Sequence, residues 1–216
     1  MMHIAKNIPE SRIKELDEFF FDENGAYRLH RAEDILRIAA EDIAVWCHKK
    51  AIYGLPTQEL VSFLRNEIGD KKAIEIGAGH GYLGESLGII QTDSYLQLKP
   101  KIKAQYKIMG QPIINYPSRV REYEATEAIK RFNPDIVIGM WITQRSKDAA
   151  IPQSSPYGIN EKSIIKKVDK YIMIGCESQH NMKLIREYPH QVIKADWILS
   201  RALDRESNVI YIWDRI

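Results

Sequence analysis

The segment AIEIGAGHGYLGESLG, residues 73–88, constrains the fold more than any other part of the chain. A short apolar run contains an acid, and glycines follow at positions 77, 79, 81 and 84 before a helical pattern begins. Strands are joined to helices in this way around bound nucleotides, because side chains on the loop would block the backbone from the ligand. The segment therefore predicts a strand, a nucleotide-binding loop and a helix.

Short apolar runs alternate with helical patterns from residue 71 onward, which is typical of a mostly parallel sheet covered on both faces. The predicted strands are 73–76, 89–92, 119–122, 135–140, 171–175, 191–195 and 208–213. The predicted helices between them are 82–87, 126–132, 160–168 and 181–188. The segments 97–117 and 145–160 carry turn-forming residues and are predicted to be irregular. We therefore expect an α/β fold with seven strands.

Residues 1–69 read as helical by the spacing of their apolar residues. One amphipathic helix is predicted over 32–50, and a second begins after Thr57, a good N-cap, and ends at Gly69. We expect two parts: a helical extension at 1–69 on the substrate side, and a ligand-binding α/β domain at 70–216.

Composition narrows the possible partners. The chain has 216 residues, with 31 Lys plus Arg against 29 Asp plus Glu and a formal net charge of +2, so it does not carry the excess of basic residues typical of general nucleic-acid binders. No apolar run approaches the ~20 residues that cross a bilayer, and the first residues do not resemble a secretory signal, so we expect a cytoplasmic protein without a membrane partner. Cys47 and Cys176 are expected to be reduced, buried thiols, and no metal site is predicted.

The glycine-rich segment satisfies two templates. Gly79, Gly81 and Gly84 fit the dinucleotide pattern G-x-G-x-x-G, while Glu75 and the glycines at 77, 79 and 81 fit the more specific acid-x-G-x-G-x-G. A pyrophosphate has no use for a carboxylate as near as Glu75, whereas the sulfonium and ammonium of S-adenosylmethionine can pair with one. Asp93, 18 residues later, can accept hydrogen bonds from the ribose hydroxyls of either ligand and does not separate them.

Over residues 55–216 the sequence resembles the class I, seven-stranded S-adenosylmethionine-dependent methyltransferases. The matching segments are EIGAGHG, the TD that ends at Asp93, EYEATEAI, PDIVIGMW and the closing residues 192–216, which fit the family's final antiparallel strands. The resemblance implies a Rossmann-like sheet and S-adenosylmethionine as cofactor. The cofactor-binding residues that it implies are Glu75, Gly77, Ala78, Gly79, Gly81, Asp93, Glu124, Ala125 and Met140. Glu124 departs from the commoner Asp at the position that faces adenine.

The methyl acceptor is expected where the fourth and fifth strands end, because ligands of open α/β sheets bind beyond the carboxyl ends of the strands. Those ends read GMWITQ and GCESQH. Trp141 and Gln144 are predicted to contact the acceptor, and Glu177 with His180 is a candidate general acid–base pair. The alternative position for the acceptor is against the N-terminal helices around Tyr53 and Thr57.

The acceptor class is narrowed by motifs that the chain lacks. Enzymes of this fold that methylate amino groups of nucleic-acid bases carry Asn or Asp, two prolines and an aromatic residue after the fourth strand, where this chain has GMWI at 139–142. A small molecule or a protein side chain is therefore favoured over a nucleic-acid base as the acceptor. Two other hypotheses stay open: a nicotinamide-dependent oxidoreductase, and a non-catalytic module that binds S-adenosylmethionine or a partner.

Overall fold

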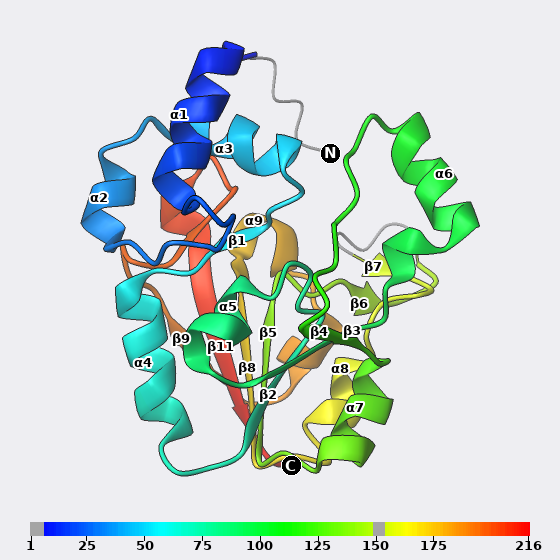
Figure 1. The fold of residues 1–216 in the computed structure, drawn as a ribbon. Helices are drawn as coiled ribbons and strands as arrows, with labels where there is room; N and C mark the ends of the chain where they lie inside the picture. The colour runs from blue at the N-terminus through cyan, green and yellow to red at the C-terminus, as the bar shows by residue number, and fades with distance from the viewer. Residues whose placement is uncertain (1–6, 149–153) are drawn as a thin grey trace.

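The computed structural model describes residues 7–148 and 154–216, and Figure 1 shows a central sheet with helices on both faces. The strands of this sheet follow the order β4-β3-β2-β5-β8-β11-β9. β11 runs antiparallel to β8 and β9, and the other neighbours are parallel. The strands are β2 Ala73–Ile76, β3 Ile90–Asp93, β4 Val120–Glu122, β5 Ile136–Met140, β8 Lys170–Cys176, β9 Gln191–Ile193 and β11 Asn208–Asp214.

All seven predicted strands are confirmed, with ends within two residues of the prediction. After β2 the chain builds β3 and β4 on one side of it, and then returns to place β5 on the other side. The strand order therefore reverses between β2 and β5. Open α/β sheets bind ligands at such a switch point, beyond the carboxyl ends of the strands.

Two helical layers cover the sheet, and the residues of each strand alternate between them. In β5, Ile136 and Ile138 pack on one layer, while Val137 packs on the other. The first layer contains α4 (Gln58–Ile68) and α5 (Tyr82–Leu87). The second contains α7 (Ala125–Phe132) and α8 (Glu161–Ile164).

The N-terminal helices form a third apolar cluster, which Figure 1 places at the end of the sheet where β1 and α9 lie. They are α1 Glu10–Phe20, α2 Ala32–Leu36 and α3 Ala40–Lys49. Trp46 and Phe20 are fully buried in this cluster with ring centroids 4.4 Å apart. β1 (Gly54–Leu55) pairs with β10 (Leu199–Ser200), so this helical group contacts a segment near the C-terminus.

The single helix predicted over 32–50 is wrong, because the chain breaks between α2 and α3. The break frees backbone carbonyl groups, and Arg205 binds two of them: Nη1 donates to Leu36 O at 3.2 Å and Nη2 to Ile38 O at 2.7 Å. Arg205 lies on η3 (Arg205–Ser207), more than 160 residues away. Apolar periodicity continues through the break and does not reveal it.

Two predictions for the second half of the chain also need correction. The segment 97–117, predicted to be irregular, contains η1 (Leu96–Leu98) at its start and α6 (Pro100–Ile108), whose first turn begins with a proline. The helix predicted over 181–188 is replaced by α9 (Glu177–His180) and η2 (Leu184–Glu187), and the helix predicted over 160–168 is limited to α8.

The segment predicted as a loop at 145–160 lies partly outside the described residues. Its described ends contain β6 (Gln144–Arg145) and β7 (Ser154–Ser155), which pair in parallel. Cys47 and Cys176 are buried free thiols, as expected. None of the described helices has both the length and the apolar character needed to cross a bilayer.

Candidate active site

The glycine loop joins β2 to α5 at the switch point of the sheet. Gly77, Gly79 and Gly81 all have positive φ, at 57°, 56° and 72°. At Gly81 a Cβ atom would lie 2.5 Å from Gln91 Oε1 and 2.7 Å from Val120 Cγ2, so a side chain is excluded by both conformation and space. The Ala78 amide donates to Thr92 O at 3.0 Å, which fixes the loop to the end of β3.

Asp93, the last residue of β3, binds this loop directly. Its Oδ2 accepts from the Gly79 amide at 3.0 Å, and its Oδ1 accepts from the Tyr95 amide at 3.0 Å. Its side chain also accepts a hydrogen bond from the Tyr116 hydroxyl. Burial raises the pKa of Asp93, although all three of these bonds favour the ionised carboxylate. The structure thus brings two predicted cofactor residues, Gly79 and Asp93, into contact.

A segment that follows α6 lies over the same place. Ile114 is buried, and its Cδ1 lies 3.2 Å from the position of a Cβ on Gly79. The Ile114 amide donates to Gln97 Oε1 at 2.8 Å, and the Tyr116 ring stacks on Tyr95 with centroids 4.2 Å apart. Segment 114–116 therefore covers Gly79 and Asp93 in this structure.

A cavity of about 500 Å³ borders the loop on the side of the N-terminal helices. His80 of the glycine loop lines it, and its Nε2 lies 3.0 Å from Lys50 O of the helical group. Burial lowers the pKa of His80 despite this contact, which favours the neutral ring. The cavity therefore lies between the loop, the N-terminal helices and the segment that follows α6.

Glu75 lies in β2 as predicted, and its carboxyl group is turned into the protein. Its side chain points beneath the loop, is 2% exposed, and accepts from the Gly84 amide at 2.9 Å. Burial raises its pKa to about 8, and the Gly84 amide and Arg119 only partly offset this effect. The raised pKa favours the neutral carboxyl group, which binds the first turn of α5 through the Gly84 amide.

The pKa of Glu75 predicts how stability depends on pH. The pKa of Glu75 in the folded protein lies above the ~4.3 of an unfolded Glu. The stability that Glu75 contributes to the folded state is therefore fully present below pH ~4.3 and is lost as the pH rises through about 8. Glu75→Gln keeps an acceptor for Gly84 and does not ionise. We expect the free energy of unfolding of wild type to fall relative to that of Glu75→Gln as the pH rises from about 5 to about 9. The change in this difference should be about 2–5 kcal/mol, at ~1.36 kcal/mol per pKa unit.

Urea unfolding of both proteins at five pH values measures this difference. Glu85→Gln is the control, because Glu85 is exposed and pairs with Arg119 at 2.8 Å. The Glu85 variant should follow wild type across the range. A constant difference between Glu75→Gln and wild type from pH 5 to pH 9 would show that Glu75 does not titrate there.

The remaining cofactor candidates occupy the ends of β4 and β5. Glu124 is the N-cap residue of α7, and its amide donates to Glu127 Oε2 at 3.3 Å, the arrangement of a capping box. Ala125 is buried in the first turn of this helix. Met140 ends β5 and packs against Gly54, where a Cβ would lie 1.8 Å from its Sδ. The Met140 side chain thus meets β1 directly.

Trp141 follows β5 and has φ of 56°, in the left-handed region that bulky residues rarely adopt. Its amide donates to Ile174 O of β8 at 2.8 Å, so the turn is held by the sheet. Its indole Nε1 is buried and has no hydrogen-bond partner among the described residues. A strained aromatic residue with an unpaired donor at the end of a central strand marks a candidate binding position.

His180 and Glu177 do not form the predicted acid–base pair. His180 is fully buried, its Nδ1 lies 3.0 Å from both the amide nitrogen and the carbonyl oxygen of Cys176, and burial lowers its pKa to about 3. Glu177 instead pairs with Lys194 at 2.6 Å near the surface. A residue with so low a pKa is a poor proton acceptor at neutral pH, so His180 serves here as a packing residue beside Trp141, with ring centroids 5.3 Å apart.

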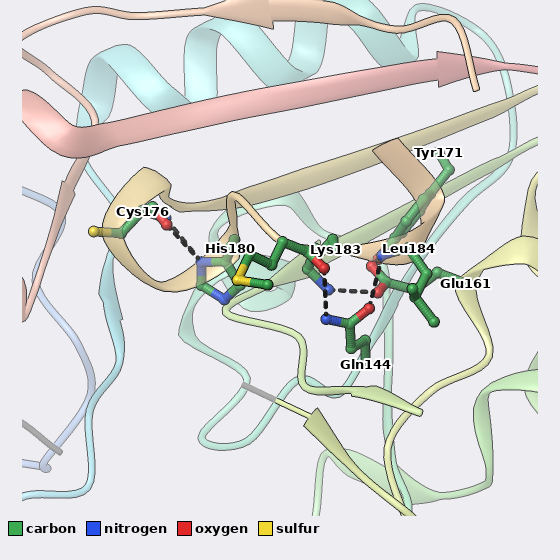
Figure 2. Close-up of polar contacts among 8 residues, drawn as sticks. Gln144, Glu161, Tyr171, Cys176, His180, Lys183 and Leu184 are labelled. Carbon is green, nitrogen blue, oxygen red and sulfur yellow. Dashed lines mark hydrogen bonds and ion pairs between the residues drawn. The ribbon is translucent and has the colours of Figure 1, made fainter. Parts of the chain in front are cut away.

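Gln144 is also structural. It is 3% exposed, its Nε2 donates to Met182 O at 3.3 Å, and its Oε1 accepts from the Leu184 amide at 2.8 Å. Figure 2 shows it next to a buried ion pair, between Lys183 Nζ and Glu161 Oε2, whose other carboxylate oxygen accepts from the Tyr171 hydroxyl at 2.8 Å. Both the nitrogen and the oxygen of the Gln144 side-chain amide are therefore hydrogen-bonded inside the protein.

No protein-family model matches this chain, and no curated protein matches its sequence. The sheet has seven strands, of which β11 alone runs opposite to the other six, with a glycine loop after β2 and an acid at the end of β3. The chain has the class I methyltransferase fold.

Solved structures give distant matches. An S-adenosylmethionine-dependent O-methyltransferase from Thermotoga maritima aligns at TM-score 0.42 and 10% identity, over 81% of this chain and 71% of that one. The E. cuniculi Mtq2–Trm112 complex, responsible for methylation of the termination factor eRF1, aligns at TM-score 0.37 and 13% identity, over 73% and 93%. SMU.776, solved with S-adenosylhomocysteine, aligns at TM-score 0.35 and 10% identity over 69% of this chain; the chain spans 48% of that protein.

Beyond the carboxyl end of β5 lie residues that the sequence prediction missed. Arg201 follows β10 and its guanidinium carbon lies 4.0 Å from the ring centroid of Tyr53 and 5.3 Å from that of Trp141. A hydrogen bond joins the hydroxyls of Tyr53 and Tyr106. Tyr53 was named as an alternative, together with Thr57, which is instead a buried N-cap. Arg201 and Tyr106 belong to no motif, and only the folded chain brings them together.

Proposed function

We propose that this chain is an S-adenosylmethionine-dependent methyltransferase with its cofactor on the glycine loop and Asp93. The observation that carries the proposal is the contact between the Gly79 amide and the Asp93 carboxylate at the switch point of the sheet. A backbone cradle without side chains lies beside a carboxylate that can accept hydroxyl donors there. A nucleoside ligand needs both of these features.

The glycine loop and the Asp93 carboxylate fit the nucleoside part of the cofactor. The Asp93 carboxylate accepts the Tyr116 hydroxyl here, and it would accept the ribose hydroxyls of the bound cofactor in the same way. Glu75 takes no direct part, and it holds the loop through Gly84. S-adenosylmethionine supplies an activated methyl carbon, and the protein orients the acceptor and excludes water.

The acceptor side lies at Trp141 and Met140, beyond the end of β5. His180 and Glu177 supply no general base, so the acceptor atom must carry its lone pair at neutral pH or lose its proton to another group. A small molecule or a protein side chain is favoured over a nucleic-acid base, because the residues after β5 lack the proline-rich motif that holds a flipped base.

Thermal unfolding with three ligands tests the proposal. S-adenosylhomocysteine at a hundredfold excess over its dissociation constant stabilises the folded state by about 2.7 kcal/mol, which for a chain of this size raises the melting temperature by roughly 5–11 °C. S-adenosylmethionine should act similarly and NAD should have no effect. A shift with NAD and none with S-adenosylhomocysteine would replace the proposal with a nicotinamide-dependent oxidoreductase.

A further inference from the structure

Arg201 has an unusual environment for a cationic side chain. It is partly buried, where Tyr53 of the segment before β1 meets Trp141 at the end of β5. It also lies close to α3 and α6: burial raises the pKa of Cys47 and of Tyr106 and lowers that of His48, and the charge of Arg201 opposes the two rises and adds to the fall. Four separate segments thus converge on one guanidinium group.

No carboxylate neutralises this group. Among residues 7–148 and 154–216, Arg201 has no ion pair within 4.0 Å, and its guanidinium makes no hydrogen bond; only its backbone amide donates, to Tyr53 O at 3.1 Å. By contrast, Arg12, Arg31 and Arg119 each bind a carboxylate. An arginine that lies between aromatic rings keeps the N–H groups at its edge available for a planar, bidentate anion.

A second unpaired donor lies beside it. The indole Nε1 of Trp141 is buried without an acceptor, although a buried donor without a partner is costly. The positive φ of Trp141 holds the ring in this position despite the strain. Two donors without acceptors, at the carboxyl end of a central strand, indicate a ligand that supplies oxygen acceptors.

We propose that Arg201, Tyr53 and Trp141 form the acceptor subsite, and that the acceptor is a small molecule with a carboxylate group. This inference rests on the proposed function, because it assigns the substrate class of the same enzyme. The carboxylate binds the edge of the Arg201 guanidinium, and a small movement of the Trp141 ring brings its indole N–H to the same anion. The Tyr53 ring holds Arg201 in place, and the Tyr53–Tyr106 hydrogen bond holds Tyr53.

Benzoate is the probe, with benzamide as its neutral counterpart of the same shape. The chain has four tryptophans, so its indole N–H resonances are few, and Trp141→Phe identifies the one from Trp141. We expect millimolar benzoate to move that resonance and leave those of Trp46, Trp197 and Trp213 in place. Benzamide should bind at least about tenfold more weakly, since hydrogen bonds to charged groups are worth ~1.5–3 kcal/mol.

Variants of Arg201 separate its role from general charge. Arg201→Gln should weaken benzoate at least about tenfold, and Arg201→Lys should fall between it and wild type because an ammonium lacks the planar fork. Arg121→Gln is the matched control: Arg121 also lies over an aromatic ring, 5.3 Å from the Phe132 centroid, but outside this subsite. It should bind benzoate as wild type does. Each variant should bind S-adenosylhomocysteine with an affinity within about threefold of wild type. This corresponds to a change in binding free energy well under the ~1.4 kcal/mol of a tenfold change.

Three results would overturn the inference. They are an unmoved Trp141 resonance, equal responses to benzoate and benzamide, and a stronger response to inorganic phosphate than to benzoate. If S-adenosylhomocysteine binds and benzoate does not, the carboxylate subsite is wrong and the proposed function stands. If benzoate binds and S-adenosylhomocysteine does not, the proposed function is wrong and Arg201 has no role as an acceptor residue.

Discussion

Replacing Lys183 with methionine is expected to lower the melting temperature by roughly 6–20 °C, the equivalent of about 3–5 kcal/mol for a chain of this size. Lys183 and Glu161 are both buried, with side chains 0% and 3% exposed, and pair with each other between η2 and α8. Methionine fills a similar volume and leaves the Glu161 carboxylate buried with only the Tyr171 hydroxyl to stabilise its charge. Burial already lowers the pKa of Lys183, and Glu161 opposes that effect.

Two further variants show whether the loss comes from the uncompensated charge. Lys183→Met combined with Glu161→Gln removes both charges and keeps an acceptor for Tyr171, so it should recover most of the stability. Lys162→Met removes the lysine of the exposed pair with Glu187, which joins the same two elements, and should leave the melting temperature almost unchanged. Equal losses in Lys183→Met and Lys162→Met, measured by calorimetry, would contradict this interpretation.

The sheet was predictable because its central strands β2, β5, β8 and β11 are apolar runs buried on both faces, with turn-forming residues between them. Local chemistry was equally informative in α4, where Thr57 accepts from the Leu60 amide at 3.1 Å and Gly69 ends the helix as expected. α5 was predicted with the correct limits, since glycine precedes it and follows it. Each of these elements is determined by residues close to it in sequence.

The parts that were not predicted depend on residues far apart in sequence. The break between α2 and α3 is stabilised by Arg205, and the proposed acceptor subsite depends on Arg201, which no motif connects with Tyr53 or Trp141. Burial also changed the expected chemistry of one acid and one base that were placed correctly in the fold. Glu75 and His180 lie beside the predicted site, but burial favours the neutral form of each. A sequence shows that an acid ends a strand and does not show whether its carboxylate reaches the ligand.

Replacing Gly79 with valine is expected to abolish the binding of S-adenosylhomocysteine. Gly79 has φ of 56°, its amide donates to Asp93, and a Cβ there would lie 3.2 Å from Ile114 Cδ1, in the space between the loop and the segment that covers it. A branched side chain occupies the space that the ligand needs and disfavours the positive φ that directs the amide to Asp93. Loss of affinity should exceed a hundredfold, or about 2.8 kcal/mol, because the cradle and the position of Asp93 are disturbed together.

Gly88 provides the matched control. It has φ of 72° and ends α5, and nothing lies within 4 Å of a Cβ placed on it. Gly88→Val therefore carries a similar conformational strain without occupying the space beside Asp93. Both variants should melt a few degrees below wild type, and if Gly79→Val does not fold, Gly79→Ala and Gly88→Ala give a milder pair.

Calorimetric titration of S-adenosylhomocysteine into wild type, Gly79→Val and Gly88→Val tests most directly whether the loop at residues 77–81 holds the cofactor. We expect wild type to bind one ligand per chain. Gly88→Val should bind with an affinity within about threefold of wild type, a difference in binding free energy under ~1.4 kcal/mol. A folded Gly79→Val should show no measurable heat of binding. Unchanged affinity in a folded Gly79→Val protein, or no binding to wild type, would show that this loop is not a cofactor site.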